Sequence, residues 1–165
     1  MNVIEKTIRR KLQHYNPKKY WKLRERVVNP QKKYSKILKA IWLFKIKRSD
    51  AFNNASTGAH LNYGAKFESM PKLPHGLYGI IISHNAVIGK NCTIFHQVTI
   101  GEGNNGAPVI GDNCVIGAGA KITGGIKIGN NVKIGTNCVV AWDVPDNSTV
   151  VMPKPRILIK DEVKA

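Results

Sequence analysis

Apolar residues recur at every sixth position through most of this chain. The series comprises Leu61, Phe67 and Leu73, then Ile82, Ile88, Ile94 and Ile100, and finally Ile110, Ile116, Ile122, Ile128, Ile134 and Val140. A period of six fits neither the 3.6-residue turn of an amphipathic helix nor the two-residue alternation of an ordinary strand. It predicts short strands wrapped around a three-sided prism, with three repeats in each turn. The fold class is therefore expected to be mainly β.

The other positions of each repeat support this prediction. Counted from the apolar residue, the fourth position from Ile82 onward is filled by Asn85, Asn91, Gln97, Gly103, Asn113, Gly119, Gly125, Asn131, Asn137 and Asp143. Gly, Asn and Asp accept a left-handed backbone at low cost, so we expect a corner at each of these residues. The fifth position is small or β-branched and includes Cys92, Cys114 and Cys138. We interpret the cysteines as small inward-facing apolar residues and expect Cys92 and Cys114 to stack on one face.

The N-terminal third of the chain has a different pattern. Residues 1–50 carry 16 Lys and Arg against three acidic residues, a net charge of +13 out of +16 for the whole protein. Helices interrupted at Pro17 and Pro30 are expected here. The stretch Tyr34–Arg48 has two interpretations. Its apolar residues either cap the open end of the prism or, with the neighbouring lysines, form an amphipathic helix that lies on anionic lipid. No nucleic-acid-binding motif accompanies the charge, so a nucleic-acid partner is not expected.

The composition of the 165 residues indicates the cellular compartment in which the protein is expected. The sequence has no run of 18 apolar residues and no segment typical of a secretory signal. Three cysteines without paired spacing fit a reducing compartment. We therefore expect a cytoplasmic protein, in contact with the inner face of the membrane if residues 1–50 bind lipid.

The repeat resembles that of the left-handed hexapeptide-repeat acyltransferases over residues 55–157. The resemblance is strongest to the serine acetyltransferase-like branch, which includes O-acetyltransferases of capsule and exopolysaccharide pathways. It is carried by the segments 61–66 (LNYGAK), 79–82 (GIII), 98–101 (VTIG) and 117–122 (GAGAKI). The resemblance implies a left-handed parallel β-helix, acetyl-CoA as co-substrate, no metal, and a homotrimer with sites between neighbouring chains. The predicted organisation is a basic helical segment at 1–54, the β-helix at 55–157 and a tail at 158–165.

The register of the repeat places candidate site residues in one column. His75 and His96 both occupy the third position of repeats one turn apart, and Ala118 and Thr136 continue the same series. Because stacked strands lie about 4.8 Å apart, such a column is roughly 14 Å long and suits an extended pantetheine arm. His75 also stands at the spacing of the family's catalytic histidine, nine residues after Lys66. We expect His75 to act as general base, since imidazole titrates near neutral pH, and His96 to assist it or contact substrate.

The resemblance assigns the remaining candidates as well. Ala118 and Thr136 fall where backbone groups hold pantetheine, and Lys121 is expected beside them. Lys154 and Arg156, in a variant of the family's closing loop, are expected to meet CoA phosphates. His84 lies on another face, from which a trimer would bring it toward His75 of the adjacent subunit.

Two departures bear on the acceptor. The serine enzymes have Asp where this chain has Pro74 and His60, and those carboxylates serve the amino-acid acceptor. We therefore expect Pro74, His60 and His84 to line a different acceptor pocket, for a sugar in polysaccharide biosynthesis that is either free or lipid-linked. The alternatives are serine O-acetylation, as in cysteine biosynthesis, and a prism that serves only as a scaffold.

Overall fold

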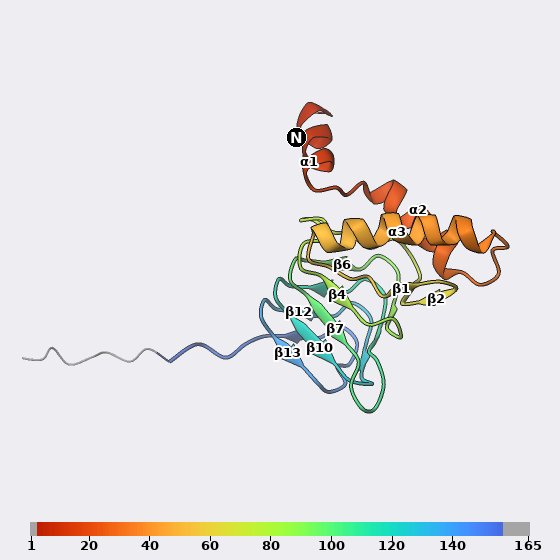
Figure 1. The fold of residues 1–165 in the computed structure, drawn as a ribbon. Helices are drawn as coiled ribbons and strands as arrows, with labels where there is room; N and C mark the ends of the chain where they lie inside the picture. The colour runs from red at the N-terminus through yellow and green to blue at the C-terminus, as the bar shows by residue number, and fades with distance from the viewer. Residues whose placement is uncertain (1–2, 157–165) are drawn as a thin grey trace, which may run out of the picture.

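The computed structural model describes residues 3–156, and its parallel strands form a three-sided β-helix of the left-handed type, as the repeat predicts (Figure 1). The first face contains β4 (Ile81–Ile82), β7 (Thr99–Gly101), β10 (Lys121–Thr123) and β13 (Val139–Val140). The second contains β3 (Lys66–Phe67), β5 (Val87–Ile88), β8 (Val109–Ile110) and β11 (Lys127–Ile128). The third contains β6 (Thr93–Ile94), β9 (Val115–Ile116), β12 (Lys133–Ile134) and β14 (Thr149–Val150).

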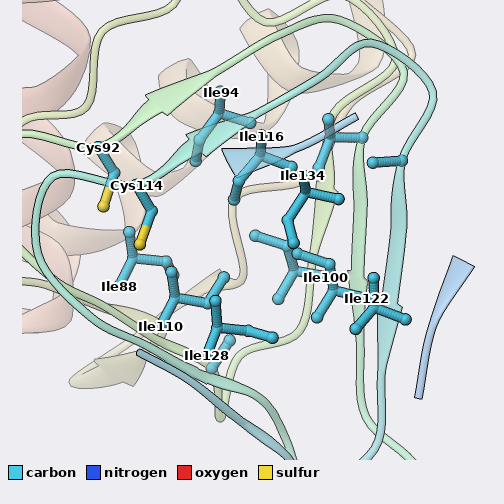
Figure 2. Close-up of a cluster of buried hydrophobic side chains, with 14 of the residues drawn as sticks. Ile88, Cys92, Ile94, Ile100, Ile110, Cys114, Ile116, Ile122, Ile128 and Ile134 are labelled. Atoms are coloured by element: carbon cyan, nitrogen blue, oxygen red, sulfur yellow. The ribbon is translucent and has the colours of Figure 1, made fainter. Parts of the chain in front are cut away.

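Strands of successive coils pair so that equivalent positions of the sequence repeat lie side by side. Ile82 pairs with Ile100, which pairs with Ile122, and the equivalent isoleucines pair on the other two faces. Each of these side chains points inward, so the interior is a stack of isoleucines with few exposed atoms (Figure 2). Cys92 and Cys114 lie one above the other in the same stack, and all three cysteines are buried and free. The Sγ atoms of Cys92 and Cys114 lie 3.2 Å and 3.1 Å from the backbone carbonyls of Gly111 and Gly129, respectively. These contacts support the interpretation of the cysteines as packing residues.

The prediction of left-handed corners is correct for two edges of the prism and wrong for the third. Asn91, Asn113, Asn131, Gln97, Gly119 and Asn137 all have φ between +56° and +71°. Asn85, Gly103, Gly125 and Asp143 do not have positive φ. The turns at this third edge are held by side chains instead, since the Oγ atom of Ser83 accepts from the amide of Asn85, and Glu102 binds both residues from the next coil.

Three helices precede the prism: α1 (Val3–Leu12), α2 (Pro17–Val28) and α3 (Lys36–Phe52). We call residues 13–54, which include α2 and α3, the cap, because α3 lies across the N-terminal end of the prism (Figure 1). Asn16 and Ser35 cap the N-termini of α2 and α3. A short hairpin of β1 (Ala59–His60) and β2 (Tyr63–Gly64) follows the cap and leads into the first coil.

The helix α3 packs on the molecule with a different face from the one its sequence suggests. Ile37, Leu38, Ile41 and Phe44 are exposed, Phe44 by 66%. The inward residues are instead Lys39, Ile46, Ser49 and Asp50, with Trp42 and Leu43 half-buried. The expectation that the apolar residues of this stretch cap the prism is therefore wrong for four of the five it rested on. The reason is that α3 docks through Ile46 and through polar contacts of Lys39 and Asp50 to the hairpin and α2, and the hydrophobic pattern does not report these polar contacts.

Candidate functional site

Most of the site residues predicted from the sequence fall at, or beside, two different corners of the prism. One, which we call the His75 corner, joins the third face to the first and comprises residues 74–80, 95–98, 117–120 and 135–138. The other, the His84 corner, joins the first face to the second and comprises residues 83–86, 102–108, 124–126 and 141–144. The hairpin β1–β2 lies against the His84 corner.

At the His75 corner, the two candidate histidines are in contact. The rings of His75 and His96 meet edge to face, with centroids 4.8 Å apart. His75 is exposed on the turn that precedes β4, whereas His96 is half-buried. The extra residues between Leu73 and Ile82 form this turn, so the interruption of the repeat is what projects His75 outward.

His96 has an unusual feature in its Nδ1 atom. This atom is buried and has no hydrogen-bond partner among the described residues. A buried polar atom without a partner costs free energy, and such atoms in native proteins call for a specific explanation. Its position beside the exposed His75 makes the pair a candidate centre for proton transfer.

The coils stack at this corner as the register predicts. The amide of Gly119 donates to the carbonyl of His96, and the amide of Asn137 donates to the carbonyl of Ala118. His96, Ala118 and Thr136 therefore occupy the same place in three successive coils. A shallow groove of about 410 Å³ runs beside them, lined by Asn54, Tyr78, Gly79, Gln97, Gly119, Lys121 and Asn137. Lys121 lies in this groove, where its Nζ atom donates to the carbonyl of Gln97 at 2.8 Å.

Lys154 and Arg156 are not brought to this groove. They lie on an exposed segment that follows β14 and runs away from the prism (Figure 1). Ile157 and the predicted tail 158–165 lie outside the described residues.

At the His84 corner, three rings form a cluster. His60 and Tyr63 stack nearly parallel, with centroids 4.7 Å apart and an interplanar angle of 5°. His84 meets both of them edge-on, at 5.4 Å and 5.7 Å. The pKa of His60 is lowered by partial burial and, to a smaller extent, by the nearby charges of Lys47 and His84. This lowered pKa favours the neutral imidazole, whose ring can stack or accept a hydrogen bond.

Glu102 is a residue of this corner that the sequence analysis missed. Its carboxylate accepts from the side chains of Ser83 and Asn85, and these hydrogen bonds, with a smaller contribution from His84, lower its pKa. Tyr63 was also not singled out as a site residue. The signal that would have found Glu102 is its place just after β7, one coil above Ser83 and His84.

The largest cavity near these rings, about 860 Å³, lies between α2 and the second face. Its lining includes Tyr63, His84 and Asn85 together with Trp21, Arg24 and Phe67. It is thus continuous with the His84 corner and open to a small polar or aromatic ligand. Pro74, in contrast, lies next to His75 and not with His60, so the predicted acceptor residues are divided between the two corners. Among residues 3–156, no group of three or more His, Cys, Asp or Glu side chains is placed to hold a metal ion.

Comparisons with known proteins agree with this architecture. Residues 107–141 match the family described as bacterial transferase hexapeptide (six repeats). A serine acetyltransferase from Staphylococcus aureus (strain Mu50) is 43% identical over 112 residues, which cover 66% of this chain and 52% of that protein. This chain therefore spans about half the length of that curated relative.

Two solved structures of similar proteins are complexes with a ligand. A serine acetyltransferase from Brucella abortus strain S19 in complex with coenzyme A superimposes with a TM-score of 0.64 at 28% identity, covering 86% of this chain and 53% of that one. The enzyme from Neisseria gonorrhoeae in complex with serine gives a TM-score of 0.57 at 35% identity, covering 73% of this chain and 48% of the other.

Proposed function

Starting from a β-helix built of hexapeptide repeats of the bacterial transferase type, we propose that this protein is an acetyl-CoA-dependent O-acetyltransferase. The proposal is supported by relatives named serine acetyltransferase and by the fold shared with the coenzyme A complex from Brucella abortus. The observation that carries it is the contact of His75 with His96 at the head of the column formed with Ala118 and Thr136.

His75 is the proposed general base. In the reaction, the acceptor hydroxyl loses its proton to the imidazole while its oxygen attacks the thioester carbonyl of acetyl-CoA. The tetrahedral intermediate then collapses, the carbon–sulfur bond breaks, and the proton passes from the imidazolium to the departing CoA sulfur. His96 orients the His75 ring by edge-to-face contact. No covalent acyl-enzyme is needed, so the buried cysteines take no part.

The pantetheine arm is proposed to run along the groove beside Ala118 and Thr136. Lys121 borders this groove and offers a cation there, with its Nζ atom bonded to the carbonyl of Gln97. Lys154 and Arg156 would reach CoA phosphates only if the segment after β14 folds back on the prism when the ligand binds. Their role in phosphate binding stays a prediction.

The acceptor has two candidates, and the relatives favour L-serine. Each relative and solved structure reported above is named serine acetyltransferase, whereas none of these names points to a polysaccharide. A carboxylate that could meet the ammonium group of serine is present as Glu102 at the His84 corner. The sugar acceptor keeps two observations in its favour: Pro74 and His60 stand where carboxylates are expected, and His60 stacks on Tyr63 to form an exposed aromatic surface.

A homotrimer is proposed because hexapeptide-repeat transferases are typically trimers and because the candidate residues are split. A threefold arrangement would set the His84 corner of one subunit against the His75 corner of the next. Thioester, base and acceptor groups would then meet only between chains. This arrangement explains why one chain divides its site residues between two corners.

The test is an acetyl-transfer assay that detects released CoA thiol, with L-serine and a panel of sugars as acceptors. His75→Ala is expected to lower kcat by about 100-fold or more while the oligomer and CoA binding persist. His14→Ala, the same change in the N-terminal segment, is the matched control and should be near wild type. Near wild-type turnover of His75→Ala would exclude His75 as the base. Absence of transfer to any acceptor, together with absence of CoA binding, would favour the scaffold alternative.

A further inference from the structure

The helix α3 turns most of its apolar side chains away from the protein. Its outward face carries Ile37, Ile41, Phe44 and Phe52, exposed by 76%, 47%, 66% and 57%. Its inward face carries Ile46, exposed by 1%, together with the polar residues Lys39, Ser49 and Asp50, each less than 7% exposed. A surface helix normally turns its apolar stripe toward the core. An apolar stripe turned outward indicates contact with something apolar outside the chain.

A second apolar stripe lies on α1. Ile4, Ile8 and Leu12 follow one another at four-residue spacing, so they share one face of the helix, and each is more than half exposed. The C-terminal end of α1 meets the C-terminal end of α3, where the rings of His14 and Phe52 lie 4.2 Å apart. Both helices therefore belong to the end of the molecule away from the last coils of the prism (Figure 1).

Basic side chains lie beside Phe44 on the outward face of α3. A groove of about 610 Å³ between the three helices is lined by Phe44 together with Lys11, Lys19, Lys45 and Arg48. Residues 1–50 as a whole carry a net charge of +13. The combination of exposed apolar residues with flanking Lys and Arg is typical of segments that lie in the interface of an anionic bilayer.

From this arrangement, we infer that the outward faces of α1 and α3 form a docking surface for an anionic lipid membrane. The apolar side chains enter the boundary between headgroups and acyl chains, and the lysines and arginines meet lipid phosphates. A second copy of the chain is a poorer occupant, because a symmetric contact would bring two surfaces of high positive charge together. Within residues 3–156 no helix is long and apolar enough to cross a bilayer, so the contact is peripheral. The inference goes beyond acetyl transfer and does not depend on it.

The test is co-sedimentation of the full chain with vesicles of phosphatidylcholine alone or mixed with phosphatidylglycerol. We expect binding to the anionic vesicles, weak binding to the neutral ones, and release by salt, because exposed charges are screened over about 10 Å at 0.1 M. Phe44→Glu should lower partitioning onto anionic vesicles by about tenfold or more, since it replaces a membrane-inserted ring by a carboxylate.

The matched control is Trp142→Glu, which makes the same change of charge and removes an aromatic residue that is 59% exposed and lies just after β13, in the last coils of the prism. This variant should bind like the wild-type chain, and circular dichroism should show that both variants are folded. Equal loss in the two variants, or no loss in Phe44→Glu, would overturn the inference. The inference would also be overturned if the wild-type chain did not bind vesicles and Phe44→Glu changed the oligomeric state. That result would make the surface a contact between copies of the chain or with another protein.

Discussion

The prism is filled by stacked isoleucines, whereas the cap combines a small apolar cluster with buried polar groups. In the prism, each coil repeats the contacts of the one below, and the inward residues are apolar. In the cap, Arg24 is buried, with its guanidinium carbon 5.5 Å and 4.5 Å from the ring centroids of Trp21 and Phe67, and it donates to the carbonyls of Thr57 and Ala65 at 2.9 Å and 2.6 Å.

The polar contacts of the cap continue behind this arginine. Tyr20 donates to the carboxyl group of Asp50 and lies 2.7 Å from the hydroxyl of Thr57. Lys39 reaches the side chain of Asn62 in the hairpin at 2.7 Å. Apolar packing tolerates small changes in shape, but a buried polar network is costly when one member is lost. The difference predicts that the cap is the more easily broken of the two regions.

The largest effect is expected from Arg24→Ala. This change removes a buried charge and leaves the carbonyls of Thr57 and Ala65 without a donor, which should cost about 3–5 kcal/mol of unfolding free energy. The measurement is urea unfolding, followed by tryptophan fluorescence and by circular dichroism. Trp21 and Trp42 lie in the cap and Trp142 in the prism, so fluorescence mainly follows the cap.

Arg26→Ala is the matched control, because Arg26 lies on the same helix and is only half-buried over the rings of Tyr34 and Trp42. Its cost should be below about 1 kcal/mol. In Arg24→Ala, the fluorescence transition should move to lower urea than the β-sheet signal. Two arginine variants with the same midpoint would show that the cap does not depend on the buried guanidinium.

The two regions also differ in how far the sequence predicts them. Ile82 to Val140 repeat a single environment, so a period of six is sufficient to give the strands, their register and the inward direction of every isoleucine. The contacts of Arg24 with Thr57 and Ala65 join residues that are 33 and 41 positions apart in the sequence. Because they are not part of a repeat, no periodic pattern in the sequence predicts them. The packed face of α3 likewise depends on contacts that do not repeat, so the hydrophobic pattern predicts the wrong face.

The candidate site was predictable to a similar extent. The register placed His96, Ala118 and Thr136 in one column, because these residues belong to the repeat. The ring cluster of His60 with Tyr63 and the hydrogen bonds of Glu102 depend on a hairpin and on an interruption of the repeat. These irregular segments take their shape from tertiary contacts, and the sequence pattern does not encode that shape locally.

A second prediction concerns the pH dependence of the cap. Burial raises the pKa of Asp50 to about 6, and the hydrogen bond from Tyr20 offsets this only in part. Because the folded-state pKa lies above the value of about 3.9 for an unfolded Asp, the native protein binds more protons than the unfolded chain between these two values. The contribution of Asp50 to stability is full below about pH 4 and is lost as pH rises through 6, an effect of roughly 2–3 kcal/mol.

Asp50→Asn tests this prediction, because an amide keeps the shape but does not titrate. The unfolding free energy of the variant should fall less than that of the wild-type chain between pH 4 and pH 7. Other titrating groups contribute to both curves, so the difference between the two proteins is the quantity to measure. Parallel curves would mean that Asp50 does not titrate in this range.

A third prediction returns to the prism, where an outward change should affect ligand binding without affecting the fold. Thr136→Trp places a large ring on the exposed end of the column and should raise the Kd for CoA by about tenfold, or about 1.4 kcal/mol. Thr149→Trp, which adds the same bulk at an exposed residue of β14 on the third face, is the control. Calorimetry should find normal CoA affinity in the control and similar melting temperatures in both. Unchanged affinity in Thr136→Trp would place the pantetheine elsewhere.

The smallest effect is expected at a corner of the prism. Asn131 has φ of 56°, and its side-chain amide joins a ladder in which Asn113 donates to Asn131 and Asn131 donates to Asn147. Asn131→Ala loses these exposed hydrogen bonds and places a Cβ-bearing residue without a local polar partner in the left-handed region, which should cost about 1 kcal/mol. Asn131→Gly loses the same hydrogen bonds but keeps the backbone conformation at low strain, so its cost should be a few tenths of a kcal/mol. Urea unfolding of the pair separates the two contributions. If glycine destabilises as much as alanine, the ladder of side-chain amides, and not the left-handed backbone, is what stabilises this edge of the prism.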